Sequence, residues 1–506
     1  MRGLIFFLLL VVTSAVVKAQ TRPNIILFFV DDMGWVDTSV PFGDSMVVVN
    51  KRYHTPNMQR LASEGIKFTN AYATPVCTPT RISLLTGINA AHHGVTNWTS
   101  PVKDRSTDVA DDEMAPASWL VNGLSSIKGT AKTIFANTYP QLLKQAGYFT
   151  VHVGKAHWGS MGTPGSNPYN LGFMVNIAGH AAGHPQSYLA KDNFGNITGK
   201  AVAQAVPDLE EYFGSDTFLT EALTLEAIKA LEAPINNKQP FYLNMAHYAI
   251  HTPIQGDKRY VQKYIDAGLD SIEANYASLI EGMDKSLGDL MNYLKEKGIE
   301  KNTVILFMSD NGGLSLVPPR GGVAHTHNLP LKSGKGSVYE GGIRVPMIVK
   351  WPGVVKANTR SDQYIIVEDF FPSILEIAGL KNYNIVQQVD GKSFVSQLKN
   401  PGYKNSSRSL VWHFPNKWQP NDGPGINYKS AIRQGDWKLI YNMRDGSKEL
   451  YNLQLDVGEL QNLASVERKK VDALAILLSH QLRQWKAVMP SFKTTGKIVP
   501  LPDRVQ

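Results

Sequence analysis

The chain has 506 residues, of which 43% are hydrophobic, with a single cysteine and a formal net charge of +8. One cysteine excludes any internal disulfide, so the fold must be held together by a large hydrophobic core. The positive excess is modest and comes without a basic tail or a nucleic-acid-binding motif. This composition argues against a nucleic-acid partner and is compatible with a polyanionic substrate.

The N-terminus predicts export. Arg2 supplies a positive charge, residues 4–12 are apolar, and small residues precede Gln20. This pattern is typical of a cleaved secretory signal over residues 1–19; an uncleaved anchor is the alternative. The apolar run is too short to span a bilayer, and no later stretch reaches that length. We therefore expect a periplasmic or secreted protein with no membrane anchor.

Apolar runs of strand length alternate with helical patterns up to about residue 390. The strand candidates are residues 24–30, 148–153, 240–245 and 303–309, and the helix candidates are residues 139–145, 218–231 and 276–297. Strands that alternate with helices predict an α/β fold with a parallel sheet. Such sheets bind ligands just beyond the carboxyl ends of their strands. Polar residues that follow these strands are therefore candidates for a site.

The pattern changes after Asp390. Short strand-like runs at residues 409–413, 431–433 and 437–441 precede one helical segment, residues 468–485. We expect a large domain over residues 20–390. A smaller C-terminal α+β subdomain, with a small antiparallel sheet and a helix, is expected over residues 391–506.

The only cysteine opens a stretch that predicts a short helix. Pro79 fits the first turn, where a missing N–H costs nothing, and Gly87 can end the helix. Cys77 would then lie at the helix N-terminus, where free N–H groups and the helix dipole favour an anion. Arg81 would place a cation on the same face. The alternative is a buried free cysteine near a surface arginine.

Two of the predicted strands end in the same kind of polar turn. Asp31 and Asp32 follow the first strand, while Asp310 and Asn311 follow the strand at residues 303–309. Carboxylate and amide oxygens are hard ligands that suit Ca²⁺ better than Zn²⁺. Either turn alone would be ordinary, but two of them after matched apolar strands predict a metal site.

The stretch Cys-Thr-Pro-Thr-Arg, followed by Leu-Thr-Gly and ending at Gly87, resembles the signature of the formylglycine-dependent (type I) sulfatases. These are arylsulfatase-like members of the alkaline phosphatase superfamily, and the resemblance extends over residues 23–463. It implies a large mixed, mainly parallel sheet sandwiched by helices, with the catalytic domain at residues 20–390. It also implies that a maturation enzyme converts Cys77 to formylglycine (3-oxoalanine). The implied ligands of one Ca²⁺ ion are Asp31, Asp32, Cys77, Asp310 and Asn311.

The same resemblance implies roles for five further residues. Arg81 and His157 would assist the hydrated aldehyde, and Lys155 and Lys335 would hold sulfate oxygens. His251 or Lys335 would protonate the leaving alcohol. The implied reaction is attack of the hydrated aldehyde on sulfur with loss of the alcohol, followed by release of sulfate and recovery of the aldehyde. Taken alone, a lysine or histidine in a loop is more often a solvated surface residue.

Substrate choice is expected to depend on residues outside these motifs. The candidates are His184 and His325 first, then His180 and His327, and further Trp98, His247, Arg320 and His413. For each of them a solvated loop residue is an equally good interpretation. Several histidines near the catalytic motifs favour a hydroxyl-rich ligand, so we expect a sulfated carbohydrate substrate. The alternatives are a phosphoester or phosphonate monoester hydrolase of the same superfamily and, from another class, a catalytically silent glycan-binding protein.

Overall fold

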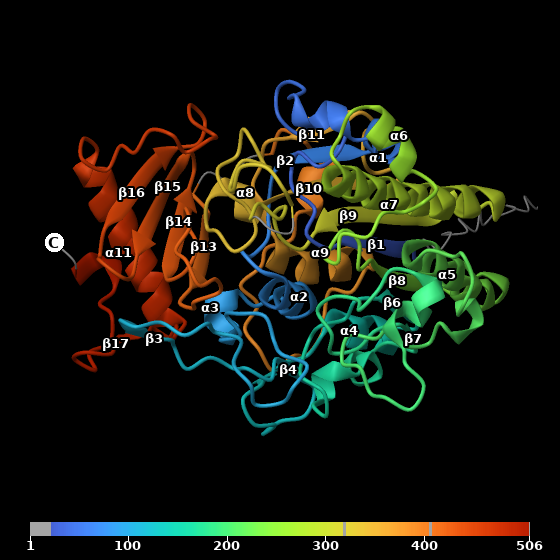
Figure 1. The fold of residues 1–506 in the computed structure, drawn as a ribbon, viewed down its shortest axis with the longest axis horizontal. Coiled ribbons are helices and arrows are strands. Elements are labelled where there is room, and N and C mark those ends of the chain that lie inside the picture. The colour runs from blue at the N-terminus through green and yellow to red at the C-terminus, as the bar shows by residue number, and fades with distance from the viewer. Residues whose placement is uncertain (1–21, 317–319, 404–406, 505–506) are drawn as a thin grey trace, which may run out of the picture.

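The computed structural model describes residues 22–316, 320–403 and 407–504, and the predicted signal segment at residues 1–19 lies outside them. Within the described residues, a nine-stranded sheet lies between layers of helices. A four-stranded sheet with its own helix lies at one end of the molecule (Figure 1). The predicted class, an α/β fold with a smaller C-terminal α+β part, is confirmed by this arrangement.

The strand order of the large sheet is β11-β2-β10-β9-β1-β8-β6-β7, with β12 beside β2. Five neighbouring strands pair in parallel: β9 (Thr303–Ser309), β1 (Asn24–Val30), β8 (Phe241–Ala246), β6 (Phe149–Gly154) and β7 (Val175–Ile177). The sheet is mixed because β10 (Arg344–Lys350) runs antiparallel to both β9 and β2 (Ile66–Tyr72). The short strands β11 (Thr359–Ser361) and β12 (Ile365–Ile366) are parallel to β2. All four predicted strands are confirmed.

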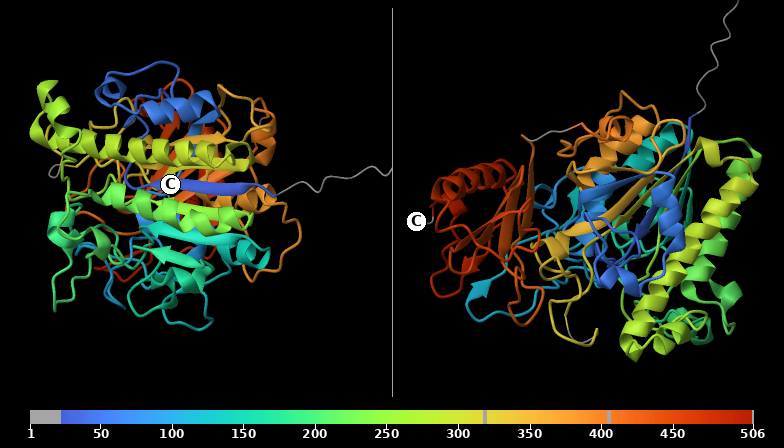
Figure 2. Two further views of the ribbon diagram at one scale, coloured as in Figure 1. Left: turned by 90° about the vertical axis from the view of Figure 1, so that its right-hand side faces the viewer. Right: turned by 90° about the horizontal axis from the view of Figure 1, so that it is seen from above.

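The central strand β1 is apolar throughout because both faces of the sheet are covered. Ile25, Leu27 and Phe29 enter one core, and Ile26, Phe28 and Val30 enter the other. The first core also contains side chains from α2 (Cys77–Thr86), α4 (Tyr139–Gln145) and α9 (Phe370–Ile377). The second contains side chains from α1 (Pro56–Ser63), α5 (Leu219–Asn236) and α7 (Ser271–Glu296). Figure 2 shows α7 on the side of the large sheet that faces away from the C-terminal sheet.

Shorter elements complete this part of the chain. They are α3 (Ala90–His93), α6 (Val261–Asp266), α8 (Glu340–Ile343), α10 (Val395–Lys399), β3 (Met114–Ala115), β4 (Leu124–Ser125), β5 (Ile134–Phe135) and β17 (Ser491–Phe492). Two helix ends differ from the prediction. Helix α7 starts five residues early, at Ser271, because the Asp270 side chain accepts hydrogen bonds from the backbone N–H groups of Ile272 and Glu273 and caps the first turn. Helix α5 continues to Asn236, past the predicted end at residue 231.

The C-terminal sheet is a series of antiparallel hairpins. It consists of β13 (Ser409–Phe414), β14 (Lys429–Gln434), β15 (Trp437–Asn442) and β16 (Lys448–Asn452), followed by α11 (Arg468–Gln484). One face packs on α11, and the other joins the core of the large sheet through side chains such as Trp412. The Trp412 indole N–H donates a 2.9 Å hydrogen bond to the Ala73 carbonyl. The boundary at residue 390 stays a prediction, and Phe394 just beyond it packs in the main core.

Glu368 is a buried carboxyl group in the helical turn that precedes α9. Its Oε1 accepts a 2.8 Å hydrogen bond from Asn89 Nδ2, whereas its Oε2 has no hydrogen-bond partner among the described residues. Burial and the neighbouring carboxylate of Asp369 raise the pKa of Glu368 to about 8.

We expect Glu368→Gln to stabilise the protein more at about pH 8 than at about pH 5. The folded protein keeps Glu368 protonated up to a pKa of about 8, whereas the unfolded chain ionises it near 4.5. The free energy of unfolding therefore falls as the pH rises from about 4.5 to about 8, by at most about 1.4 kcal/mol per pH unit. A glutamine at this position does not ionise, so the variant does not have this loss. Thermal unfolding at both pH values measures the effect. The exposed Glu296→Gln is the matched control, and an equal gain for Glu368→Gln at both pH values would contradict the prediction.

Candidate active site

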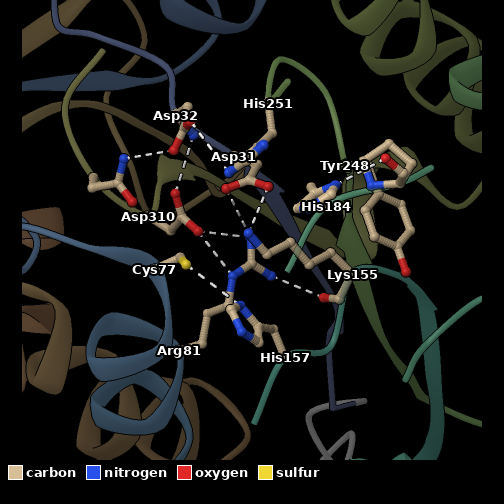
Figure 3. A network of polar contacts seen from close by, with 12 residues as sticks. Asp31, Asp32, Cys77, Arg81, Lys155, His157, His184, Tyr248, His251 and Asp310 are labelled. Atoms are coloured by element: carbon tan, nitrogen blue, oxygen red, sulfur yellow. Dashed lines mark hydrogen bonds and ion pairs between the residues drawn. The ribbon is translucent and has the colours of Figure 1, made fainter. Parts of the chain in front are cut away.

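The two predicted acidic turns meet at the carboxyl end of the large sheet, because β1 and β9 are parallel neighbours. The Asp32 backbone N–H donates to Asp310 Oδ1 at 3.1 Å, and Asn311 Nδ2 donates to Asp32 Oδ1 at 2.8 Å. Asp31, Asp32, Asp310 and Asn311 are all buried. Figure 3 shows the three carboxylates grouped between His251 and Arg81. The structure thus brings the four predicted oxygen ligands together.

Each carboxylate of this group faces a buried cation. Lys155 Nζ lies 2.7 Å from Asp31 Oδ2, Lys335 Nζ lies 2.7 Å from Asp32 Oδ1, and an Arg81 guanidinium nitrogen lies 2.8 Å from Asp310 Oδ2. Without such partners, buried charges of this kind would be strongly unfavourable. The three carboxylates and the three cations therefore cancel in formal charge.

The surroundings affect the two aspartates after β1 in opposite ways. Burial, together with repulsion from Asp310, raises the pKa of Asp31 well above its ordinary value. Burial also acts to raise the pKa of Asp32, but Lys335 and His251 outweigh it and lower that pKa. Asp32 is therefore held ionised at the wall of the site, while Asp31 lies deeper among the other acids.

The donor set fits a hard divalent cation. Asp31 Oδ1 and Asn311 Oδ1 are buried and have no hydrogen-bond partner among the described residues. Buried oxygens without a partner are costly, and carboxylate and amide oxygens are the ligands that calcium prefers. Asp31, Asp32 and His251 each offer a ligand atom within 4.8 Å of the others. His251 thus borders the predicted metal site, although the sequence did not suggest it as a ligand.

Cys77 begins α2, and Gly87 ends this helix with a left-handed φ of 71°, as predicted. The Cys77 Sγ atom lies 3.4 Å from His157 Nδ1, and His157 Nε2 lies 2.8 Å from the Thr99 carbonyl. Because a carbonyl can only accept, Nε2 carries the ring proton and Nδ1 accepts from the thiol. Burial raises the pKa of the Cys77 thiol and lowers that of His157 well below its ordinary value. The unmodified residue is therefore a protonated thiol rather than an activated thiolate.

Arg81 is buried below Cys77 rather than exposed at the surface. Its Nε donates to Asp310 Oδ2 at 2.8 Å, and a terminal nitrogen donates to the Lys155 carbonyl at 2.9 Å. The alternative interpretation, a buried cysteine beside a surface arginine, is wrong for the arginine. Arg81 connects α2 to the acidic turn after β9 and to the loop after β6.

The segment after β8 carries His251 to the site by running along the end of β1. The Asp31 backbone N–H donates to the Ala249 carbonyl at 2.9 Å, and the Ile250 N–H donates to the Asp31 carbonyl at 2.8 Å. His251 Nε2 consequently lies 3.7 Å from Asp32 Oδ2. Its ring stacks on His184 with centroids 5.6 Å apart. Burial and Lys335 lower the pKa of His251 well below its ordinary value.

A cavity of about 640 Å³ opens above these groups. Its lining includes Asp32, Cys77, His157, His251 and Lys335 from the predicted catalytic and metal groups, and His184 and Trp98 from the predicted substrate-binding groups. It also includes Arg105, Gln204 and Trp418, which the sequence did not single out because no motif surrounds them. Thr99, which orients His157, was missed for the same reason.

The other predicted substrate-binding histidines lie outside this lining. His180 accepts a backbone hydrogen bond from His157, His325 donates one to Ser315, and His327 Nε2 contacts the Gly321 carbonyl. Their role in substrate binding stays a prediction. His247, Arg320 and His413 are buried in the framework, where they contact Ser286, Glu273 and Ser430.

The family model described as "Sulfatase" matches residues 23–380. This chain belongs to the sulfatase family. The model of the N-sulphoglucosamine sulphohydrolase C-terminal region matches residues 334–487 of this sulfatase. Membership of the type I sulfatases, inferred from the stretch that begins at Cys77, is therefore confirmed, and so is the hydrolysis of sulfate esters as the activity.

Two relatives and a solved structure align with nearly the whole sulfatase. A "Sulfatase" of Formosa agariphila is 31% identical over 529 residues, which cover 96% of this chain and 92% of that protein. Human N-acetylgalactosamine-6-sulfatase is 27% identical over 500 residues, which cover 94% and 87%. The crystal structure of Ps i-CgsB in complex with k-i-k-neocarrahexaose has a TM-score of 0.66 and 26% identity, and the match covers 92% of each chain. Among the described residues of this sulfatase, no helix is both long and apolar enough to cross a bilayer.

Proposed function

We propose that this sulfatase is exported and cleaves sulfate esters of a sulfated glycan, using a formylglycine made from Cys77 and a bound Ca²⁺ ion. The observation that carries the proposal is a single cavity at which Cys77, Lys335 and His251 meet the buried acidic group. The glycan is supported by the relatives, one named for N-acetylgalactosamine and another crystallised with a neocarrahexaose. Maturation of Cys77 requires a formylglycine-generating enzyme as a partner.

Sulfate-ester cleavage needs positive charge around the sulfate oxygens and an acid that protonates the leaving oxygen. The residues around Cys77 fit both needs. Lys335 presents a cation at the cavity wall and can hold a sulfate oxygen there. Lys155 is buried outside the cavity lining, paired with Asp31, and would have to turn from it to reach a sulfate oxygen. His157 offers the lone pair of Nδ1 to position 77 and can accept a proton there. His251 and Lys335 flank the cavity and are the candidates for protonating the leaving oxygen. A formylglycine at position 77 would supply a hydroxyl nucleophile that the protonated thiol cannot replace.

Asp31, Asp32, Asp310 and Asn311 would hold the Ca²⁺ ion, with position 77 beside it. The carboxylates and cations of the site already cancel in charge. A divalent cation would therefore make the site positive, as binding of an anionic sulfate ester requires. Lys155 and Lys335 would then be free to turn from the carboxylates toward sulfate oxygens.

The proposal is tested on protein produced together with a formylglycine-generating enzyme. The peptide that contains Cys77 should be about 18 Da lighter than its thiol form, because CHO replaces CH₂SH. The same protein should release sulfate from an aryl sulfate much faster than phosphate from the matching aryl phosphate. A full mass shift with cleavage of the phosphate ester alone would instead favour the phosphoesterase alternative. Cleavage of neither ester would favour the silent glycan-binding protein.

Removing calcium should lower the melting temperature by several degrees. Bound Ca²⁺ stabilises the folded state by about 2.7 kcal/mol when its concentration is 100 times the Kd. The comparison is thermal unfolding with Ca²⁺ and with a chelator, for the wild type, for Asp32→Asn and for Asp289→Asn, which removes a half-buried carboxylate paired with Lys285. Asp32→Asn should lose most of the calcium-dependent shift, and Asp289→Asn should keep it. Equal melting temperatures of the wild type with and without Ca²⁺ would exclude a calcium site.

A further inference from the structure

The cavity has an outer wall formed by Trp98, Arg105 and Trp418, none of which contacts the acidic group. All three line the same cavity as Cys77 and Lys335. They are half-buried or exposed, whereas Cys77, His157 and Lys335 are buried. Trp98 and Arg105 belong to the long loop that precedes β3, and Trp418 follows β13 of the C-terminal sheet. The outer wall is therefore built from residues of both parts of the fold.

Arg105 is presented by a loop that is fixed on both sides. The Asp104 N–H donates to Asn122 Oδ1 at 2.8 Å, and Asn122 Nδ2 donates back to Asp104 Oδ1 at 3.0 Å. On the other side, Asp108 Oδ1 accepts a 2.9 Å hydrogen bond from Asn416 Nδ2. Because these anchors already order the backbone, a ligand that pairs with Arg105 does not need to order the loop.

Arg105 is a cation without a partner, unlike the cations deeper in the site. Its side chain is exposed and has no ion pair or hydrogen bond within the described part of the chain. The nearby carboxylate of Asp108 is already engaged by Trp119, Asn416 and Ser106. A guanidinium group pairs with a carboxylate or a sulfate through two parallel hydrogen bonds. Arg105 is thus ready to bind an anionic group at the cavity mouth.

The two tryptophans provide apolar surfaces beside this cation. The Trp418 ring packs against the backbone of Gly336, the residue after Lys335, where an added Cβ would lie only 2.0 Å from the ring. The indole N–H groups of Trp98 and Trp418 have no acceptor in the part of the chain that the structure describes. A tryptophan thus offers an apolar face and one free donor, which match the C–H face and the hydroxyl groups of a sugar ring.

We propose that the outer wall binds the sugar unit adjacent to the one that carries the scissile sulfate, and that Arg105 pairs with an anionic group on that second unit. The substrate class is then an oligosaccharide with at least two anionic groups, the second being a sulfate or a carboxylate. This inference rests on the proposed glycan sulfatase function.

The test measures competition with aryl sulfate hydrolysis by two sets of disaccharides. In the galactan set, each disaccharide carries one sulfate or two. In the chondroitin set, each disaccharide carries one sulfate, with either a uronic acid or its uncharged methyl ester as the second unit. The proteins are the wild type, Arg105→Ala, Arg105→Lys, and Lys103→Ala as the control, because Lys103 is an exposed cation of the same loop outside the cavity lining.

For the wild type, the second anionic group should lower the inhibition constant about tenfold in at least one set. Arg105→Ala should abolish most of this gain, Arg105→Lys should keep part of it, and Lys103→Ala should behave as the wild type. If Arg105→Ala loses the gain in the galactan set, the second anionic group is a sulfate. If it loses the gain in the chondroitin set, that group is a carboxylate. An equal gain in the wild type and Arg105→Ala, or no gain in the wild type, would overturn the inference. Absence of aryl sulfate hydrolysis by the matured wild type would instead overturn the proposed function on which it rests.

Discussion

Replacing Cys77 by alanine should lower sulfate release at least about 10³-fold while the protein still folds. Alanine cannot be converted to formylglycine, and it leaves the site without a nucleophile beside His157 Nδ1. The fold should tolerate the change because only the sulfur atom is lost at the first turn of α2, at a cost of roughly 1 kcal/mol. Release of sulfate from an aryl sulfate and thermal unfolding measure the two effects.

The matched control is Thr86→Ser at the other end of the same helix, where the hydroxyl group bonds only to the backbone of its own helix turn and to Ile88. This variant should retain the activity of the wild type. A Cys77→Ala protein with a tenth or more of the normal activity would show that the reaction does not depend on residue 77.

Lys335→Ala should reduce kcat/KM for sulfate esters about 10²–10³-fold, the range seen when a group that stabilises developing negative charge is removed. It should also lower the melting temperature. Of the three cations that face the carboxylates, Lys335 is the one that lines the cavity, and it offsets the buried carboxylate of Asp32 through contacts of 2.7 and 2.9 Å. Its removal leaves that carboxylate with His251 alone at the wall, and the pKa of Asp32, which Lys335 lowers, should rise.

Steady-state kinetics on an aryl sulfate and thermal unfolding measure these losses. Lys335→Arg separates charge from shape, since it keeps the cation and should retain more of the stability than of the activity. The exposed Lys356→Ala serves as the control for loss of a surface lysine. A change of less than about tenfold for Lys335→Ala would contradict a role in binding the sulfate group.

The acidic centre of the site could be predicted because it depends on short-range sequence patterns. An apolar strand followed by a polar turn occurs twice, at Asp31 and at Asp310, and parallel pairing of β1 and β9 is enough to bring the two turns together. The helix that begins at Cys77 could also be predicted from the sequence, because Pro79 and Gly87 mark its ends.

The outer part of the cavity could not be predicted, because it depends on contacts between distant segments. Trp418 reaches the cavity only because the C-terminal sheet packs against the main core, and no local pattern reports that packing. The sequence could not rank the candidate histidines by their distance from the cavity, for a related reason. His184 and His325 occupy similar polar loops in sequence, but only His184 stacks on His251 and lines the cavity.

The division of the cavity between two parts of the chain has a practical consequence for redesign. The groups proposed to break the sulfate ester lie on α2, after β1, β6, β8 and β9, and in the connection from β9 to α8, whereas Trp418 is carried by the connection between β13 and β14. That connection can be exchanged between homologues without altering a catalytic side chain. Chimeras that swap it should therefore change the substrate range and keep the reaction of the recipient.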